Sequence, residues 1–168
     1  MHALNILHRS LGSLLAGVHR RRLDTLFCAV VACVNGPRLR LTDIGRRLAS
    51  GTALRHGIKR ADRLLGNTKL QREAQTYYRA LCQVLLAQVS EPLILVDWSD
   101  LKADQSLHLL RASLAVGGRS LALYEEVHPQ RLLANRGVQT RFLQRLAHLL
   151  PPGVAPIVIA DSGFKVPF

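Results

Sequence analysis

The chain has 168 residues, a hydrophobic fraction of 48% and a formal net charge of +12. This length allows one large domain or two small ones, and the apolar fraction excludes general disorder. The three cysteines form no CxxC pair, which excludes a disulfide framework or a zinc module and favours a reducing cytoplasm. The uncharged stretch 26–34 is too short to span a bilayer, so we expect neither a signal peptide nor a membrane partner.

Positive charge is concentrated in the first half of the chain. Residues 1–90 hold fifteen Lys or Arg against four Asp or Glu, or +11, whereas residues 91–168 hold eight against seven, or +1. A basic half beside a nearly neutral half predicts a polyanion-binding module joined to a second module. A solvated basic surface without a partner is the alternative.

The first half is predicted to be helical, because its apolar residues recur at spacings of three and four. We expect helices over residues 4–18, 22–34, 41–48, 54–65 and 70–89. Gly57 weakens the first turn of the fourth helix, which makes a later start near Ile58 the alternative. Ser90-Glu91-Pro92 marks the boundary between an expected domain 1–90 and an expected domain 91–168.

The third and fourth helices together have the outline of a helix-turn-helix DNA reader. The apolar residues of segment 54–65 share one face of a helical wheel, and its basic residues share the other. The candidate DNA-binding residues are Arg46, Arg47, Arg55, Lys59, Arg60 and Arg63. Arginine suits both phosphate and guanine edges because its guanidinium is a planar fork of donors. A basic solvated face on an ordinary helical bundle is an equally good interpretation.

The second half changes to strand patterning. We expect strands over residues 93–96, 107–116, 119–126 and 157–160, with a helix over 138–150 before the last of them. Gly117-Gly118 is a strong hairpin signal. The order β-β-β-α-β returns the fourth strand parallel to the first, and the crossover rule allows the two to lie side by side. The expected fold class is therefore α+β or α/β, with a helical domain followed by a mixed sheet.

An aspartate ends each of the two strands that are expected to be neighbours. Asp97 follows Leu93-Ile94-Leu95-Val96, and Asp161 follows Ile157-Val158-Ile159-Ala160. Carboxylates at adjacent carboxyl ends of a sheet could share Mg²⁺ or Mn²⁺, the cations of phosphoryl transfer. The alternatives are a turn former at Asp161, before Ser162-Gly163, and a capping acid at Asp97.

A third carboxylate is normally needed for two-metal phosphoryl transfer. The available acids are Asp100, Asp104, Glu125 and Glu126, none of which ends a strand in the way that Asp97 and Asp161 do. No glycine-rich phosphate loop, GxSxG or HExxH motif indicates another chemistry.

Four sequence blocks resemble a known family. They are Ile58-Lys59-Arg60-Ala61-Asp62-Arg63-Leu64-Leu65-Gly66-Asn67, Val96-Asp97-Trp98-Ser99-Asp100, the hairpin from Leu110-Arg111-Ala112-Ser113 to Tyr124-Glu125, and Asp161-Ser162-Gly163-Phe164-Lys165-Val166-Pro167. The chain is similar over almost its whole length to the DDE transposases of bacterial insertion sequences in the "insertion sequence four" family. The resemblance implies an N-terminal helical DNA-binding domain, an RNase H-like catalytic domain, and a place in the bacterial cytoplasm at the nucleoid.

The resemblance also implies an activity and its residues. The family carries out Mg²⁺-dependent cut-and-paste transposition at inverted-repeat ends of double-stranded DNA, as a dimer. Asp97 matches its first catalytic aspartate and Asp161 its second. The family's catalytic glutamate lies in a downstream Tyr…Arg…Glu…Lys motif, whereas this sequence stops at Phe168. We therefore expect an incomplete transposase without full catalytic competence. The alternatives are a non-catalytic DNA-binding fragment that inhibits transposition and a decayed remnant.

Overall fold

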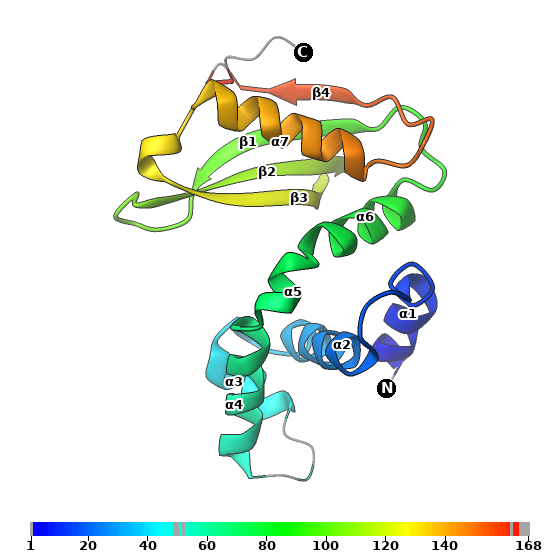
Figure 1. Ribbon diagram of the computed structural model, residues 1–168, viewed down its shortest axis with the longest axis vertical. Helices are drawn as coiled ribbons and strands as arrows, with labels where there is room; N and C mark the ends of the chain where they lie inside the picture. Colours follow the sequence, from blue (N-terminus) through cyan, green and yellow to red (C-terminus); the bar gives the residue numbers. More distant parts are fainter. Residues whose placement is uncertain (1, 49–50, 52, 162, 165–168) are drawn as a thin grey trace. The chain divides into compact units, whose positions relative to one another are not determined.

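The computed structural model describes residues 2–48, 51, 53–161, 163 and 164. The chain forms two compact units, residues 1–80 and 81–168 (Figure 1). The division falls inside helix α6 (Ala74–Leu85), earlier than the expected boundary at residue 90. The physical reason is that the end of this helix packs with the sheet. Cys82 is fully buried, and its thiol donates a weak hydrogen bond to the Leu123 carbonyl at 3.8 Å.

The first unit is helical, as expected, although two helices differ from their predicted extents. Its elements are α1 (His2–Leu11), α2 (Arg20–Val34), α3 (Leu41–Leu48), α4 (Leu54–Leu65), α5 (Thr68–Arg72) and the first part of α6. Helix α1 ends at Leu11 instead of residue 18, and turns follow it. Leu15 and Val18 are nevertheless buried, so their spacing indicated burial and not helix.

The expected helix over 70–89 is divided into α5 and α6, with Glu73 between them. Asn67 caps α5, since its side-chain oxygen accepts hydrogen bonds from the backbone N–H groups of Lys69 and Leu70 at 3.0 and 3.1 Å. Helix α4 begins at Leu54, so the later start near Ile58 is wrong. Gly57 is buried, and packing outweighs the weak helix propensity of glycine.

The core of the helical unit joins α2, α3 and α4. Its buried residues are Ala29, Ala32, Leu48, Ala61 and Leu64. Helices α3 and α4 approach closely because Gly45 has no side chain. A Cβ at position 45 would overlap the Cα of Ile58 and lie 2.7 Å from its backbone nitrogen. This glycine therefore sets the spacing of the two helices that carry the candidate DNA-binding residues.

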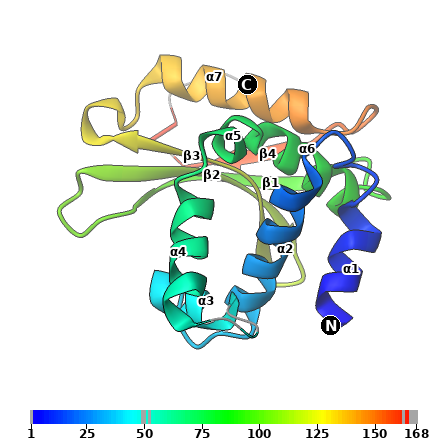
Figure 2. The same ribbon diagram turned by 60° about the horizontal axis from the view of Figure 1, so that its bottom comes forward.

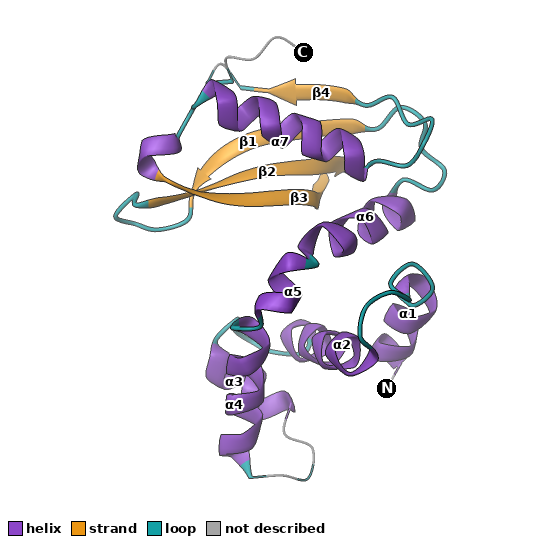
Figure 3. Ribbon diagram, in the orientation of Figure 1, coloured by secondary structure: helices purple, strands orange, loops and turns teal. Residues whose placement is uncertain are grey.

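The second unit is a four-stranded mixed sheet, coloured orange in Figure 3. Its strands are β1 (Leu93–Asp100), β2 (Leu107–Val116), β3 (Arg119–Pro129) and β4 (Ile157–Ala160), in the order β3-β2-β1-β4. The β1–β2 and β2–β3 pairs are antiparallel, and β4 lies parallel to β1. The expected order of elements and the parallel pairing of the first and last strands are confirmed. Gly117 and Gly118 have φ values of 51° and 76°, as a tight hairpin turn requires.

Helix α7 (Arg136–Leu149) covers one face of this sheet (Figure 1). Val138, Phe142, Leu146 and Leu149 are buried along the helix, and Ile94 and Val96 are buried on β1. Asn135 caps α7 by accepting a hydrogen bond from the Val138 N–H at 3.1 Å. A short 3₁₀ turn (Gln130–Leu132) connects β3 to the helix. The strand pleat leaves alternate β1 residues, such as Leu95 and Asp97, exposed on the opposite face.

None of the helices in the described part of the chain combines the length and apolar character that a membrane crossing requires.

Candidate nucleic-acid interface and candidate metal site

The six candidate DNA-binding residues lie on α3 and α4. Helix α3 packs against α4, and α2 contacts both (Figure 2). All six residues are exposed. Arg46 and Arg47 lie on α3, and Arg55, Lys59, Arg60 and Arg63 lie on α4. The fold therefore gathers them on one helical unit at its surface, where cations can meet a polyanion.

Few internal contacts compete for these cations. Arg46 lies 3.5 Å from the Asp43 carboxylate in an exposed pair, which contributes little in water. An Arg60 guanidinium nitrogen lies 3.5 Å from the Thr25 hydroxyl, which is long for a hydrogen bond. Among the described residues, no carboxylate pairs with Arg55, Lys59 or Arg63. These three charges remain available to a ligand.

Three further basic residues, at the start of α2, join α4 around a cleft of about 320 Å³. His19, Arg21 and Arg22 line it on one side, with Arg60 and Arg63 on the other. The sequence interpretation missed the α2 residues. Their signal is the run His19-Arg20-Arg21-Arg22, but only the packing of α2 on α4 brings it beside the basic residues of α4.

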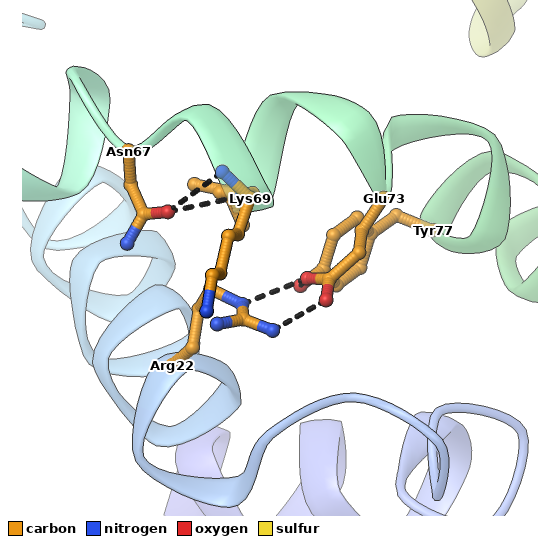
Figure 4. Close-up of polar contacts among 6 residues, drawn as sticks. Arg22, Asn67, Lys69, Glu73 and Tyr77 are labelled. Atoms are coloured by element: carbon orange, nitrogen blue, oxygen red, sulfur yellow. Dashed lines mark hydrogen bonds and ion pairs between the residues drawn. The ribbon is translucent and has the colours of Figure 1, made fainter.

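Arg22 is held by an ion pair inside the helical unit (Figure 4). Its Nε donates to Glu73 Oε2 at 2.8 Å, and its Nη2 donates to Oε1 of the same carboxylate. Tyr77 donates to Glu73 Oε2 at 3.2 Å. The bond from Arg22 holds the pKa of the Glu73 carboxyl below its ordinary value, and burial raises the pKa of Tyr77 to about 12. Glu73 thus carries a negative charge and fixes the Arg22 side chain.

Asp97 and Asp161 occupy neighbouring positions in the sheet. Val96 on β1 pairs with Ala160 on β4, and each aspartate is the next residue along the chain. Adjacent strands lie about 4.8 Å apart, so the backbones at these two positions lie about one strand spacing from each other. Both residues are exposed. The predicted juxtaposition of these two positions is therefore present in the register.

The turn after β4 holds Asp161 in place. Its Oδ1 accepts a hydrogen bond from the Gly163 N–H at 3.0 Å, so Asp161 also serves as the turn former considered from the sequence. The Gly163 carbonyl in turn accepts from Nε2 of Gln139 at 3.1 Å, and Gln139 is fully buried on α7. The second Asp161 oxygen has no described protein donor and remains available.

Arg111 separates these two aspartates from the nearest further acid on the same face. The strand register places Asp97 opposite Arg111, and Arg111 opposite Glu125. The Arg111 Nε donates to Glu125 Oε1 at 2.6 Å. Glu125 is therefore two strands away from Asp97 and is already paired with a cation.

The other three acids are also engaged elsewhere. Asp100 lies 3.0 Å from Nδ1 of the buried His108. Asp104 Oδ1 accepts from the Ser106 backbone and hydroxyl, and the backbone bond lowers the pKa of Asp104. Glu126 accepts from Tyr124 at 2.5 Å and from Arg145 at 2.8 Å. Burial alone would raise the pKa of Glu126, but these two bonds hold it below its ordinary value.

The donor set at Asp97 and Asp161 fits one hydrated Mg²⁺ or Mn²⁺. Mg²⁺ in phosphoryl-transfer sites commonly keeps several waters and binds one or two carboxylates together with substrate phosphate oxygens. The described residues contain no group of three or more His, Cys, Asp or Glu that could hold a metal ion. A complete protein cage is therefore absent from the described part of the chain, whereas a two-carboxylate site open to water and substrate is compatible with it.

Trp98 is half-buried and packs against another strand of the sheet. Its ring contacts His128 edge-on, with centroids 5.6 Å apart. Its Nε1 is buried and has no hydrogen-bond partner among the described residues. Packing within the sheet therefore accounts for the position of Trp98.

No family model, no curated protein and no solved structure matches this chain.

Proposed function

We propose that the chain is a DNA-binding component of the transposase type, related to the "insertion sequence four" transposases that its sequence blocks resemble. Its helical unit binds double-stranded DNA. Its sheet unit, an RNase H-like arrangement, contributes Asp97 and Asp161 to a Mg²⁺-dependent site for cleavage and strand transfer, and a dimer assembles on the inverted-repeat ends. The observation that carries the proposal is the neighbouring register of Asp97 and Asp161 on the parallel pair β1–β4.

The DNA-binding part is supported by the exposed cations of α3 and α4. In a helix-turn-helix, the second helix enters the major groove and its first turns reach base edges. Arg55 and Lys59 lie in the first half of α4, are exposed, and have no carboxylate partner among the described residues. The excess of eleven positive charges in residues 1–90 adds a sequence-independent attraction to phosphates.

The catalytic part is supported by the chemistry of the sheet edge. A bound Mg²⁺ would supply Lewis-acid activation of a phosphodiester there. Asp97 and Asp161 would hold the ion, and the Asp161 turn keeps one carboxylate oxygen oriented through the Gly163 N–H. Gln139 supports that turn from α7. In the family a glutamate completes the site.

The first test measures binding of the full chain to a fluorescent 30-base-pair duplex by anisotropy, across a salt titration. Affinity is expected to fall steeply as salt rises, because cations displace counterions from phosphates. The Arg55→Gln/Lys59→Gln double variant is expected to weaken binding by about 1 kcal/mol or more for each lost contact.

The matched control for this test is the Arg9→Gln/Arg131→Gln double variant. Both arginines are exposed and lie outside α3, α4 and the cleft, and their removal changes the net charge by the same amount. The control is expected to retain nearly all the affinity. Equal losses in the two variants would show that charge alone, and not the α4 surface, determines binding. Absence of binding by the parent chain at about 50 mM salt would contradict the proposal.

The metal site predicts weak Mn²⁺ binding that depends on both aspartates. Mn²⁺ stands in for Mg²⁺ here, and water-proton relaxation reports its binding. Asp97→Asn and Asp161→Asn are each expected to abolish the relaxation enhancement, because one carboxylate alone is a poor site. The amide oxygen that Asp161→Asn introduces can still accept the bond from the Gly163 N–H, so the turn is retained. The control, Asp104→Asn, is expected to bind Mn²⁺ normally, and equal loss in all three variants would reject the site.

A non-catalytic DNA-binding protein is the second candidate. It is favoured by the ion pair of Arg111 with Glu125. Because Glu125 is bound to Arg111, it is not available as a third metal ligand beside Asp97 and Asp161. This candidate predicts duplex binding with no cleavage of DNA in the presence of Mg²⁺ or Mn²⁺. Cleavage by the full chain that disappears in Asp97→Asn would decide for the catalytic proposal.

A further inference from the structure

The cleft between α2 and α4 is lined by cations that come from two separate segments of the chain. Its volume is about 320 Å³, and its basic lining residues are His19, Arg21, Arg22, Arg60 and Arg63. Among the described residues that line it, none is an aspartate or a glutamate. Positive guanidinium groups around one cleft repel each other, so an anion in the cleft would be stabilised by those that have no carboxylate partner.

Among the described residues, a carboxylate neutralises one of the four arginines. Arg22 is paired with Glu73, and its side chain is 14% exposed. Within the described part of the chain, Arg21 and Arg63 meet no carboxylate, and Arg60 has only the long contact with Thr25. Three positive charges are therefore left for a ligand.

The walls of the cleft are held by contacts that leave the charges of Arg21, Arg60 and Arg63 without a carboxylate partner among the described residues. The Thr25 hydroxyl donates to the Arg21 carbonyl at 2.7 Å, one turn back along α2. Glu73 fixes Arg22 through two hydrogen bonds (Figure 4). Asn67, which also lines the cleft, is fixed as the cap of α5. A cleft with fixed walls loses less conformational entropy when a ligand binds.

We infer that this cleft binds a backbone phosphate of double-stranded DNA, an inference that rests on the proposed function. Guanidinium forks match the geometry of phosphate oxygens and bind them through paired hydrogen bonds. Arg60 and Arg63 lie in the second half of α4, beyond Arg55 and Lys59. The cleft thus fixes the register of the protein on the duplex, while the start of α4 reads base edges.

This division of roles distinguishes the two surfaces experimentally. Loss of a phosphate contact weakens binding to every sequence equally and reduces the salt dependence by about one unit of log–log slope. Loss of a base contact relaxes sequence preference instead. The test therefore compares the cleft variant Arg21→Gln/Arg63→Gln with Arg55→Gln/Lys59→Gln and the control Arg9→Gln/Arg131→Gln, all in the full chain.

The cleft variant is expected to lower affinity on the order of tenfold to a hundredfold near 0.1 M salt and to reduce the salt slope by about 0.9, the contribution of one phosphate. The loss should be the same for several duplexes of different sequence. All the substituted residues are exposed, so helicity by circular dichroism is expected to stay unchanged. Unchanged affinity and slope in the cleft variant, with the Arg55→Gln/Lys59→Gln variant impaired, would overturn the inference and leave the proposed function standing. A parent chain that binds no duplex would instead reject the proposed function itself.

A second arm of the experiment separates DNA phosphate from a small phosphate compound. Inorganic pyrophosphate is titrated into the parent chain and the cleft variant by calorimetry, and into the DNA complex as a competitor. The inference expects pyrophosphate to bind weakly to the parent chain, and a large excess to be needed to displace DNA. Tight pyrophosphate binding that requires Arg21 and Arg63, with DNA affinity unaffected by their loss, would assign the cleft to a free phosphate ligand and overturn the inference.

Discussion

Replacing Phe142 with alanine is expected to destabilise the sheet unit by about 3–5 kcal/mol. Phe142 is fully buried on α7 and stacks on Tyr124 of β3, with ring centroids 5.0 Å apart and an interplanar angle of 26°. The substitution removes the ring that joins the helix to the sheet and leaves a cavity between them. The loss is a large share of the stability of a small domain.

The single tryptophan makes this measurement specific to one unit. Trp98 lies on β1 and is the only tryptophan in the chain, so its fluorescence during urea unfolding reports the sheet unit. The control is Gln144→Ala, an exposed position on the same helix. We expect the control to shift the unfolding free energy by less than about 0.5 kcal/mol. Similar shifts in the two variants would show that α7 does not hold the sheet through Phe142.

The sheet topology could be predicted because its signals are local. Two apolar runs that end in aspartate mark β1 and β4, and Gly117-Gly118 marks the hairpin. One helix between the hairpin and the last strand then forces a parallel return. The alternation along β1 also explains why Asp97 faces away from α7.

The helix boundaries could not be predicted as well, because tertiary contacts determine them. Residues 12–18 keep an apolar spacing of three and four but form turns after α1. Glu73 interrupts the expected last helix and pairs with Arg22, 51 residues earlier in the chain. A sequence pattern contains no information about such a partner, because only the tertiary fold brings Arg22 and Glu73 together.

The same limit applies to the candidate sites. The basic face of α4 is visible as a helical pattern, whereas the cleft needs α2 beside α4. Glu125 was a candidate third carboxylate from the sequence, and the register shows that Arg111 stands between it and Asp97. Both results depend on pairing between segments, which composition and periodicity do not specify.

Replacing Gly45 with alanine is expected to separate α3 from α4 and to weaken DNA binding together with the helical unit. An added Cβ would overlap the Cα of Ile58 and lie 2.8 Å from its Cγ1. The side chain of Ile58 can rotate, but its backbone cannot move without displacing α4. Overpacking of this kind costs about 1–3 kcal/mol, which outweighs the gain of up to about 1 kcal/mol from alanine's higher helix propensity.

The matched control is Gly17→Ala, at a position in the same unit where an added Cβ meets nothing within 4 Å. Thermal unfolding followed by circular dichroism, together with duplex binding, should show Gly45→Ala impaired and Gly17→Ala close to the parent chain. The Trp98 signal should be unchanged in both, because Trp98 belongs to the other unit. Full stability and full DNA affinity in Gly45→Ala would mean that α4 does not depend on its close contact with α3. The candidate interface would then have to be assigned to α4 and the α2 cleft without α3.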